Sequence, residues 1–205
     1  AQQIDEGIEF HRRRYRTATR YLAYFQSFTN THAPLDKLRE LYDQALQNPL
    51  VAGVVIGTRP DCMPDSLLSE LAEINKQVPV IIEYGAETSH DHTLEAVNRH
   101  HTWHQVEDAV RRTHRAGISC GLHLICGLPG ESIDDILTTT RRACQLPIDT
   151  LKFHQLQIVK GSTMARQTES GEMVVKTFEV DDYIDLCIEI VRLVPRSIAI
   201  ERFVS

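Results

Sequence analysis

The segment ISCGLHLICGLPGES, residues Ile118–Ser132, decides the fold class. Its first part is a short apolar run, which is typical of a buried parallel strand. The turn GLPGE follows, and Ser132 with Asp135 three positions later predicts the capped start of a helix. The helix expected ahead of the run, Trp103–Arg115, should end before Gly117, because glycine commonly terminates helices in the left-handed conformation. Helix, strand, turn and helix in this order indicate a βα repeat.

The same alternation continues in both directions along the chain. Further apolar runs are expected to form strands, and they recur at about 30 residues, the length of a βα unit. These runs are Tyr21–Phe28, Ala52–Gly57, Pro79–Gly85 and Thr150–Gln157. Amphipathic helices are expected between them, two of which begin near Pro34 and Pro64, because proline is favoured in a first helical turn.

The ends of the chain complete this pattern. A helix is expected at Ile4–Tyr15, ahead of the first strand, and another at Asp181–Leu193. The final run, SIAIERFV, is a candidate edge or closing strand. We therefore expect one α/β domain over residues 1–205, barrel-like, with five parallel strands in sequential order and helices on one outer face. An open doubly wound sheet is the alternative.

Composition excludes several classes of protein. The chain is 42% hydrophobic and 24% charged, as globular domains are, and its net charge of −6 gives no indication of nucleic-acid binding. It has no apolar run of about 18 residues that could span a membrane, and its first residues do not resemble a signal peptide. The five cysteines are scattered, which suits a reducing cytoplasm, and no close cysteine pair or triplet offers a metal cage within this chain.

Polar side chains gather at the expected carboxyl ends of the strands, where barrel enzymes place their reactive groups. Glu83 follows an apolar run, and a buried carboxylate must be paired, protonated or ligand-bound. His123 and His154 have apolar neighbours and need polar partners if they point inward. One alternative is a metal-dependent barrel hydrolase or lyase that uses Asp61, Glu83, His123 and His154. Another is a non-catalytic ligand-binding barrel.

Five segments in this order resemble the radical S-adenosylmethionine (SAM) superfamily, most closely its YhcC-like members, which are described as Fe–S oxidoreductases. They are YFQSFTNTHAP, GVVIGTRPDCMPD, EYGAETSHDHTLEAVNRHHT, HLICGLPGES and FHQLQIVKGSTMA. The resemblance implies a partial (β/α)6 TIM-like barrel in which SAM lies against a [4Fe–4S] cluster. The cluster would be held by a C-x3-C-x2-C-type loop after the family's first strand. That strand and loop are not found in this sequence, so its strands would be the family's second to sixth, and the cluster cysteines are expected upstream.

The resemblance also implies positions that bind SAM. Gln26, Thr29 and Asn30 stand where many relatives carry a Gly-Gly-Glu motif for the methionyl amino group. The segment G-A-E-T-x5-L-x3-N-R places Glu87 at a position that holds the ribose or backbone of SAM. The same segment places Arg99 at the position that pairs with the SAM carboxylate.

The fourth expected strand supplies the remaining positions. His123 occupies a position where some relatives have a ribose-binding aspartate, and Ile125 and Gly127 resemble the adenine-binding edge. The implied reaction is reductive cleavage of SAM to a 5′-deoxyadenosyl radical that acts on a substrate which the resemblance does not specify. An electron donor such as flavodoxin or ferredoxin is implied, and the fragment by itself is expected to be inactive.

Overall fold

Six parallel strands form one sheet in the order of the sequence, β1 to β6. The computed structural model describes residues 2–26 and 29–204. The strands are β1 (Tyr21–Phe25), β2 (Val51–Thr58), β3 (Val80–Glu87), β4 (Ser119–Cys126), β5 (Thr150–Gln155) and β6 (Ala199–Arg202). The five expected strands and the candidate closing strand are confirmed, although Ser27 and Phe28 of the first run lie outside the described residues. Because the strand order does not reverse, the doubly wound alternative is wrong.

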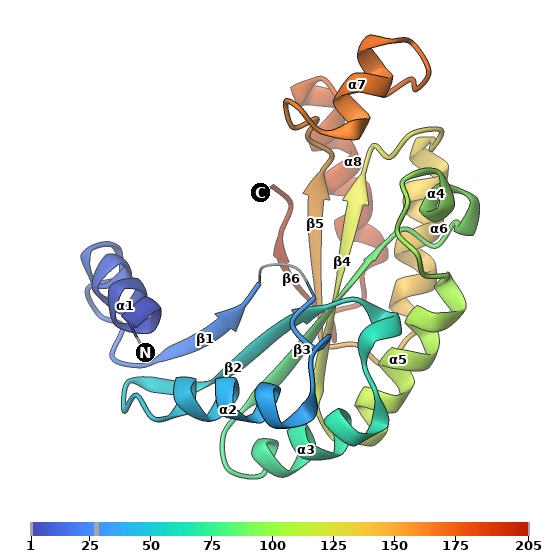
Figure 1. The fold of residues 1–205 in the computed structure, drawn as a ribbon. Helices are drawn as coiled ribbons and strands as arrows, with labels where there is room; N and C mark the ends of the chain where they lie inside the picture. The colour runs from blue at the N-terminus through green and yellow to red at the C-terminus, as the bar shows by residue number, and fades with distance from the viewer. Residues whose placement is uncertain (1, 27–28, 205) are drawn as a thin grey trace.

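The helices are α1 (Gln2–Arg14), α2 (Leu35–Leu46), α3 (Asp65–Asn75), α4 (Asp91–Ala96), α5 (Trp103–Arg115), α6 (Ile133–Cys144), α7 (Thr163–Glu169) and α8 (Val180–Leu193). Of these, α2, α3, α5, α6 and α8 connect successive strands and lie along the outside of the curved sheet, whereas α1 precedes β1 and α7 lies beyond the end of β5 (Figure 1). A short 3-10 turn covers Pro60–Cys62. A membrane-crossing helix would have to be longer and more apolar than any helix in the described part of the chain.

Local signals set where these helices begin and end. The expected capping box at α6 is present, because the Ser132 side chain accepts a hydrogen bond from the Asp135 backbone and the Asp135 side chain accepts one from the Ser132 backbone. A second capping box, not expected from the sequence, joins Thr102 and Gln105 at the start of α5. Gly117, just after α5, has a φ of 71°, which is the left-handed conformation that glycine adopts without strain.

One hydrophobic core lies between the sheet and the helices. Alternate strand residues point into it, as the pleat requires, and are at most 2% exposed. They are Val54, Ile56, Ile82, Tyr84, Leu122, Leu124, Leu151 and Phe153. Facing them are side chains of five helices, α2, α3, α5, α6 and α8, among them Tyr42, Leu71, Val106, Ile136 and Ile190. The intervening strand residues point away from these helices, toward the side that we call the open face.

Two bulges interrupt the alternation on the open face. In β3, Ala86 is an extra residue between Gly85 and Glu87, which pair with consecutive residues of β4. In β6, Glu201 is an extra residue between Ile200 and Arg202, which pair with Leu151 and Lys152 of β5. A bulge inserts one extra residue into a strand and so changes which side chains point to a given face. Both bulges lie beside polar groups of the open face, which makes this face the candidate site.

Candidate functional site

Glu83 is the centre of a polar network on the open face. Its side chain is 2% exposed and accepts hydrogen bonds from three strands. Tyr24 Oη lies 2.6 Å and His123 Nε2 2.8 Å from its Oε2, while Lys152 Nζ lies 2.5 Å from its Oε1. Gly121 lies opposite Glu83 in the register, and a Cβ there would collide with the Thr150 hydroxyl while making only ordinary contact with Glu83 Cγ, at 3.6 Å. The expectation that a buried Glu83 needs partners is confirmed.

The contacts of Glu83 determine its charge. Burial by itself raises the pKa of this carboxyl, but the hydrogen bonds from His123, Lys152 and Tyr24 outweigh burial and lower the pKa to about 2. Glu83 is therefore ionised at neutral pH. An ionised carboxylate only accepts hydrogen bonds, so the Nε2 atom of His123 must carry a proton in this contact.

Lys152 and His154 extend the network to β6. Lys152 Nζ also lies 3.1 Å from Glu201 Oε2, and it lies 5.0 Å from the centre of the Tyr24 ring. Arg202 Nη2 donates to His154 Nε2 over 3.2 Å, and the His154 ring stacks on His123 with 5.3 Å between centroids. Burial, followed by the nearby Arg202 charge, lowers the pKa of His154 to about 4, so His154 is neutral at pH 7.

Glu87 and Arg99, expected separately at the SAM site, form an ion pair at the carboxyl end of β3. Arg99 Nη2 lies 2.6 Å from Glu87 Oε1 and donates to the Gly85 carbonyl over 3.2 Å. A Cβ on Gly85 would lie 2.7 Å from Glu87 Oε1, so only glycine fits there without movement of the pair. Burial raises the pKa of the Glu87 carboxyl, and the charges of Arg99 and His123 offset this effect only in part.

The backbone around this ion pair is strained. Glu87 has a φ of 63°, and Asn98 and His100, which flank Arg99, have φ values of 58° and 59°. Residues other than glycine adopt the left-handed region at a cost, and such residues concentrate at functional sites. In addition, Arg99 Nε is buried and has no hydrogen-bond partner in the described part of the chain. Its guanidinium is thus held in place with a donor unused.

The positions expected to bind the methionyl amino group differ in their surroundings. Gln26 is exposed just after β1, and Thr29 is half-buried. Asn30 Nδ2 donates to the carbonyls of Phe25 and Gly57, both at 2.9 Å. Asn30 therefore ties the end of β1 to β2, and only its Oδ1 could contact a ligand.

The adenine-edge positions lie along β4 and its end. Ile125 alternates with core residues and is half-buried on the open face. Gly127 is buried with a φ of 90°, and a Cβ there would lie 3.0 Å from the Phe178 ring. The backbone at Gly127 therefore requires glycine on two grounds, conformation and space.

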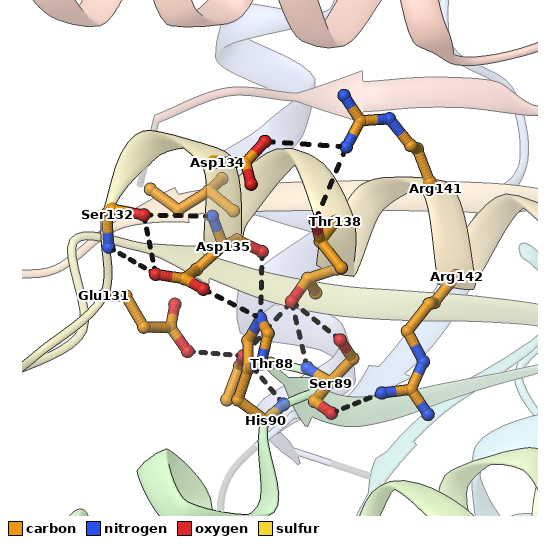
Figure 2. Close-up of polar contacts among 12 residues, drawn as sticks. Thr88, Ser89, His90, Glu131, Ser132, Asp134, Asp135, Thr138, Arg141 and Arg142 are labelled. Atoms are coloured by element: carbon orange, nitrogen blue, oxygen red, sulfur yellow. Dashed lines mark hydrogen bonds and ion pairs between the residues drawn. The ribbon is translucent and has the colours of Figure 1, made fainter.

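The turn GLPGE is attached to the end of β3 (Figure 2). Glu131 Oε1 accepts a hydrogen bond from Thr88 Oγ1 over 2.5 Å, and Arg142 Nη1 donates to the Ser89 carbonyl over 2.8 Å. The Thr139 hydroxyl, in α6, accepts from the Ser89 backbone over 3.0 Å. These contacts hold the residues directly after Glu87 against the GLPGE turn and the second half of α6, and motif inspection alone did not identify them.

Sequence reasoning also missed three members of the open-face network: Tyr24, Glu201 and Arg202. Alternation along β1 could have identified Tyr24, because its neighbours Ala23 and Phe25 pack against the core. Nothing in the sequence indicated Glu201 and Arg202, which depend on a bulge.

The proposed hydrolase residues do not come together as a set. Asp61 pairs with Arg59 at 2.6 Å. Among the described residues, no group of three or more His, Cys, Asp or Glu side chains is arranged to hold a metal ion. The described residues therefore do not fit a metal or cluster ligand set.

Comparison with protein families identifies the scaffold. The Radical SAM superfamily matches residues 2–143, and the Radical_SAM C-terminal domain matches residues 148–205. The chain belongs to the radical SAM superfamily. Membership in it implies the use of SAM and a [4Fe–4S] cluster.

Similar proteins come from bacteria and archaea. Protein YhcC of Escherichia coli (strain K12) is 39% identical over 186 residues, which cover 90% of this chain and 60% of YhcC. YtqA of Bacillus subtilis (strain 168) is 36% identical over 183 residues, covering 89% of this chain and 56% of YtqA. The chain thus spans somewhat more than half the length of these relatives. The structure of Methanocaldococcus infernus Elp3 superposes with a TM-score of 0.79, covering 98% of this chain and 52% of Elp3 at 15% identity, which supports the fold alone.

Proposed function

We propose that this chain is the core of a radical SAM enzyme that binds SAM across the carboxyl ends of β3 and β4 and presents a substrate on the open face. The [4Fe–4S] cluster would be held by residues outside these 205. When bound, SAM supplies a hydrogen-abstracting radical after reduction by one electron, for which we propose a donor such as flavodoxin or ferredoxin. We further propose that residues 1–205 act as one domain, because the sheet continues across both family matches.

The observation that carries this proposal is the arrangement of Arg99. Glu87 and the Gly85 carbonyl hold one end of its guanidinium, while its buried Nε has no partner among the described residues. The contacts to Glu87 and Gly85 use both N–H groups of Nη2, so a carboxylate would meet the Nη1 donors, for which the described residues offer no partner. The left-handed residues on both sides of Arg99 fix its backbone before a ligand arrives. Arg99 therefore suits the carboxylate of SAM.

Neighbouring residues suit the other parts of SAM. His123 Nε2 is bound to Glu83, and its other ring nitrogen, Nδ1, could contact a ribose hydroxyl. Ile125 is apolar and half-buried on the open face, so an adenine ring could pack on it, with the backbone of Gly127 beside it. We assign the amino group to Gln26, Thr29 and the Oδ1 of Asn30.

SAM binding by the cluster-loaded, full-length protein tests this proposal. In calorimetric titration, Arg99→Ala should bind SAM about thirtyfold more weakly, from roughly 2 kcal/mol for charge-assisted hydrogen bonds. Arg99→Lys should recover only part of this loss, because one ammonium cannot replace the contacts to Glu87 and Gly85 and also bind SAM. Arg39→Ala, which removes a surface arginine bound to Glu70 at 2.7 Å, is the matched control and should bind SAM normally.

A second comparison separates binding from folding. Arg99→Ala leaves the Glu87 carboxylate, 8% exposed, without its cation, so the protein should also become less stable. The double variant Glu87→Gln/Arg99→Gln removes both charges and should regain much of the stability but not the SAM affinity. If the double variant regained both, Arg99 would be structural. Normal SAM affinity in Arg99→Ala would contradict its assignment directly.

A further inference from the structure

Arg202 reaches the open face because of the bulge in β6. Ile200 packs against the core, so in a regular strand Glu201 would face the open side and Arg202 would turn back toward the helices. Instead, Lys152 is paired with Arg202 in the register, and Glu201 is the extra residue. Both side chains then contact open-face groups: Glu201 lies 3.1 Å from Lys152, and Arg202 lies 3.2 Å from His154. Bulges next to active sites commonly redirect side chains in this way.

The guanidinium of Arg202 has unused hydrogen-bond donors. Of its five N–H groups, one donates to His154, and its Nε is buried with no partner in the part of the chain that the structure describes. No carboxylate among the described residues lies within ion-pair distance of it, because Glu83 and Glu201 both contact Lys152 instead. The formal charges of Glu83 and Glu201 cancel those of Lys152 and Arg202. The site therefore offers directional N–H donors rather than a net positive field.

The partner of Arg202 does not neutralise it. Because an arginine N–H donates to Nε2 of His154, that nitrogen must be unprotonated. The low pKa of His154, about 4, which burial and then Arg202 produce, agrees with a neutral ring. A half-buried guanidinium beside a neutral imidazole is suited to an oxyanion, which can accept two parallel N–H bonds.

We propose that Arg202 anchors a carboxylate or phosphate group of the substrate on the open face beside β5 and β6. The inference rests on the proposed function, in which Arg99 holds the carboxylate of SAM near β3. The two arginines are held by different groups: Arg99 by Glu87 and the Gly85 carbonyl at the carboxyl end of β3, and Arg202 by His154 of β5, so we assign them different anions. SAM carries a single carboxylate. Arg202 therefore binds a second molecule, and the substrate class is an anionic small molecule.

Nuclear magnetic resonance of the His154 imidazole tests this site. Sodium phosphate and sodium malonate are titrated separately at pH 7 into 15N-labelled protein, with sodium chloride at equal ionic strength as reference. At least one oxyanion should shift the His154 signal along a saturable curve that chloride does not produce. The oxyanion that binds more tightly identifies the substrate group that Arg202 holds as phosphate or carboxylate.

Variants show whether Arg202 is the anchor. Arg202→Gln should weaken the oxyanion response at least tenfold, and Arg202→Lys should be intermediate because it keeps the charge without the fork. Arg192→Gln, on the exposed side of α8, is the matched control and should respond like wild type. SAM affinity should be unchanged in Arg202→Gln.

Three results would overturn the inference: no response to either oxyanion, an equal response in Arg202→Gln, or a loss of SAM affinity in Arg202→Gln comparable with that of Arg99→Ala. Failure of the proposed function looks different. A wild-type protein that does not bind SAM, yet shows an Arg202-dependent oxyanion response, contradicts the SAM site and still supports the anion site.

Discussion

Replacing Glu83 by glutamine is expected to destabilise the protein by about 3 kcal/mol at pH 7. The carboxylate is 2% exposed and accepts from Tyr24, His123 and Lys152. The glutamine amide has the same shape, but it carries no charge and brings two donors among groups that already donate. Breaking a buried ion pair by removing one partner costs roughly 3–5 kcal/mol, and the lower end applies because Lys152 keeps Glu201 at 3.1 Å.

The pH dependence gives an independent value for the same contribution. The pKa of Glu83 falls from 4.5 to about 2 on folding. A tenfold change in proton affinity corresponds to about 1.4 kcal/mol, so the ionised carboxylate contributes up to about 3 kcal/mol. Because the folded-state pKa is depressed, this contribution is present above pH 4.5 and is lost as the pH falls toward 2. Between pH 7 and pH 3.5, roughly two fifths of the difference between wild type and Glu83→Gln should disappear.

Urea unfolding followed by circular dichroism at several pH values measures both quantities. Glu70→Gln is the matched control, since Glu70 forms its ion pair with Arg39 on the surface, where such pairs contribute about 0–1 kcal/mol. Equal costs for the two substitutions would refute the argument that Glu83 is a buried, charged centre. A Glu83→Gln cost that stayed constant with pH would show that the carboxyl is not ionised in the folded protein.

Two further substitutions, with one control, probe the end of β3 and the residues that follow it. Gly85→Ala should lower SAM affinity about tenfold, or about 1.4 kcal/mol. Its Cβ would lie 2.8 Å from Arg99 Nη2 and would displace the guanidinium. Gly7→Ala, with nothing within 4 Å of its Cβ in α1, should leave SAM affinity unchanged and stabilise the helix by about 0.5–1 kcal/mol. Thr88→Val removes the hydroxyl that donates to Glu131 and should lower the free energy of unfolding in urea by about 2 kcal/mol. A decrease below about 0.5 kcal/mol would mean that this hydrogen bond does not stabilise the fold.

Much of the fold could be predicted because its signals are local. The apolar runs at β2, β3 and β4 needed no partner to be identified as buried strands, and the start of α6 was visible in Ser132 and Asp135. The site was predicted only in part. Glu87 and Arg99 were each identified by a motif, but their ion pair depends on a left-handed turn at the end of β3 that no local residue pattern indicated.

The bulge in β6 shows a second limit of sequence reasoning. Alternation predicts one open-face residue after Ile200, whereas the structure has both Glu201 and Arg202 in contact with open-face groups. An extra residue in a strand is set by pairing with the neighbouring strand, here β5, and by the groups available there. The sequence of β6 alone does not contain that information.

The sequence by itself determined the element order, the parallel sheet and the family, because hydropathy period, caps and motifs are properties of consecutive residues. Only the tertiary structure decided which polar groups meet. Glu83 lies 59, 40 and 69 positions from Tyr24, His123 and Lys152, and the four side chains converge only when β1, β3, β4 and β5 adopt their register. That register is set by packing between the sheet and its helices, where a one-residue slip would move every side chain to the opposite face.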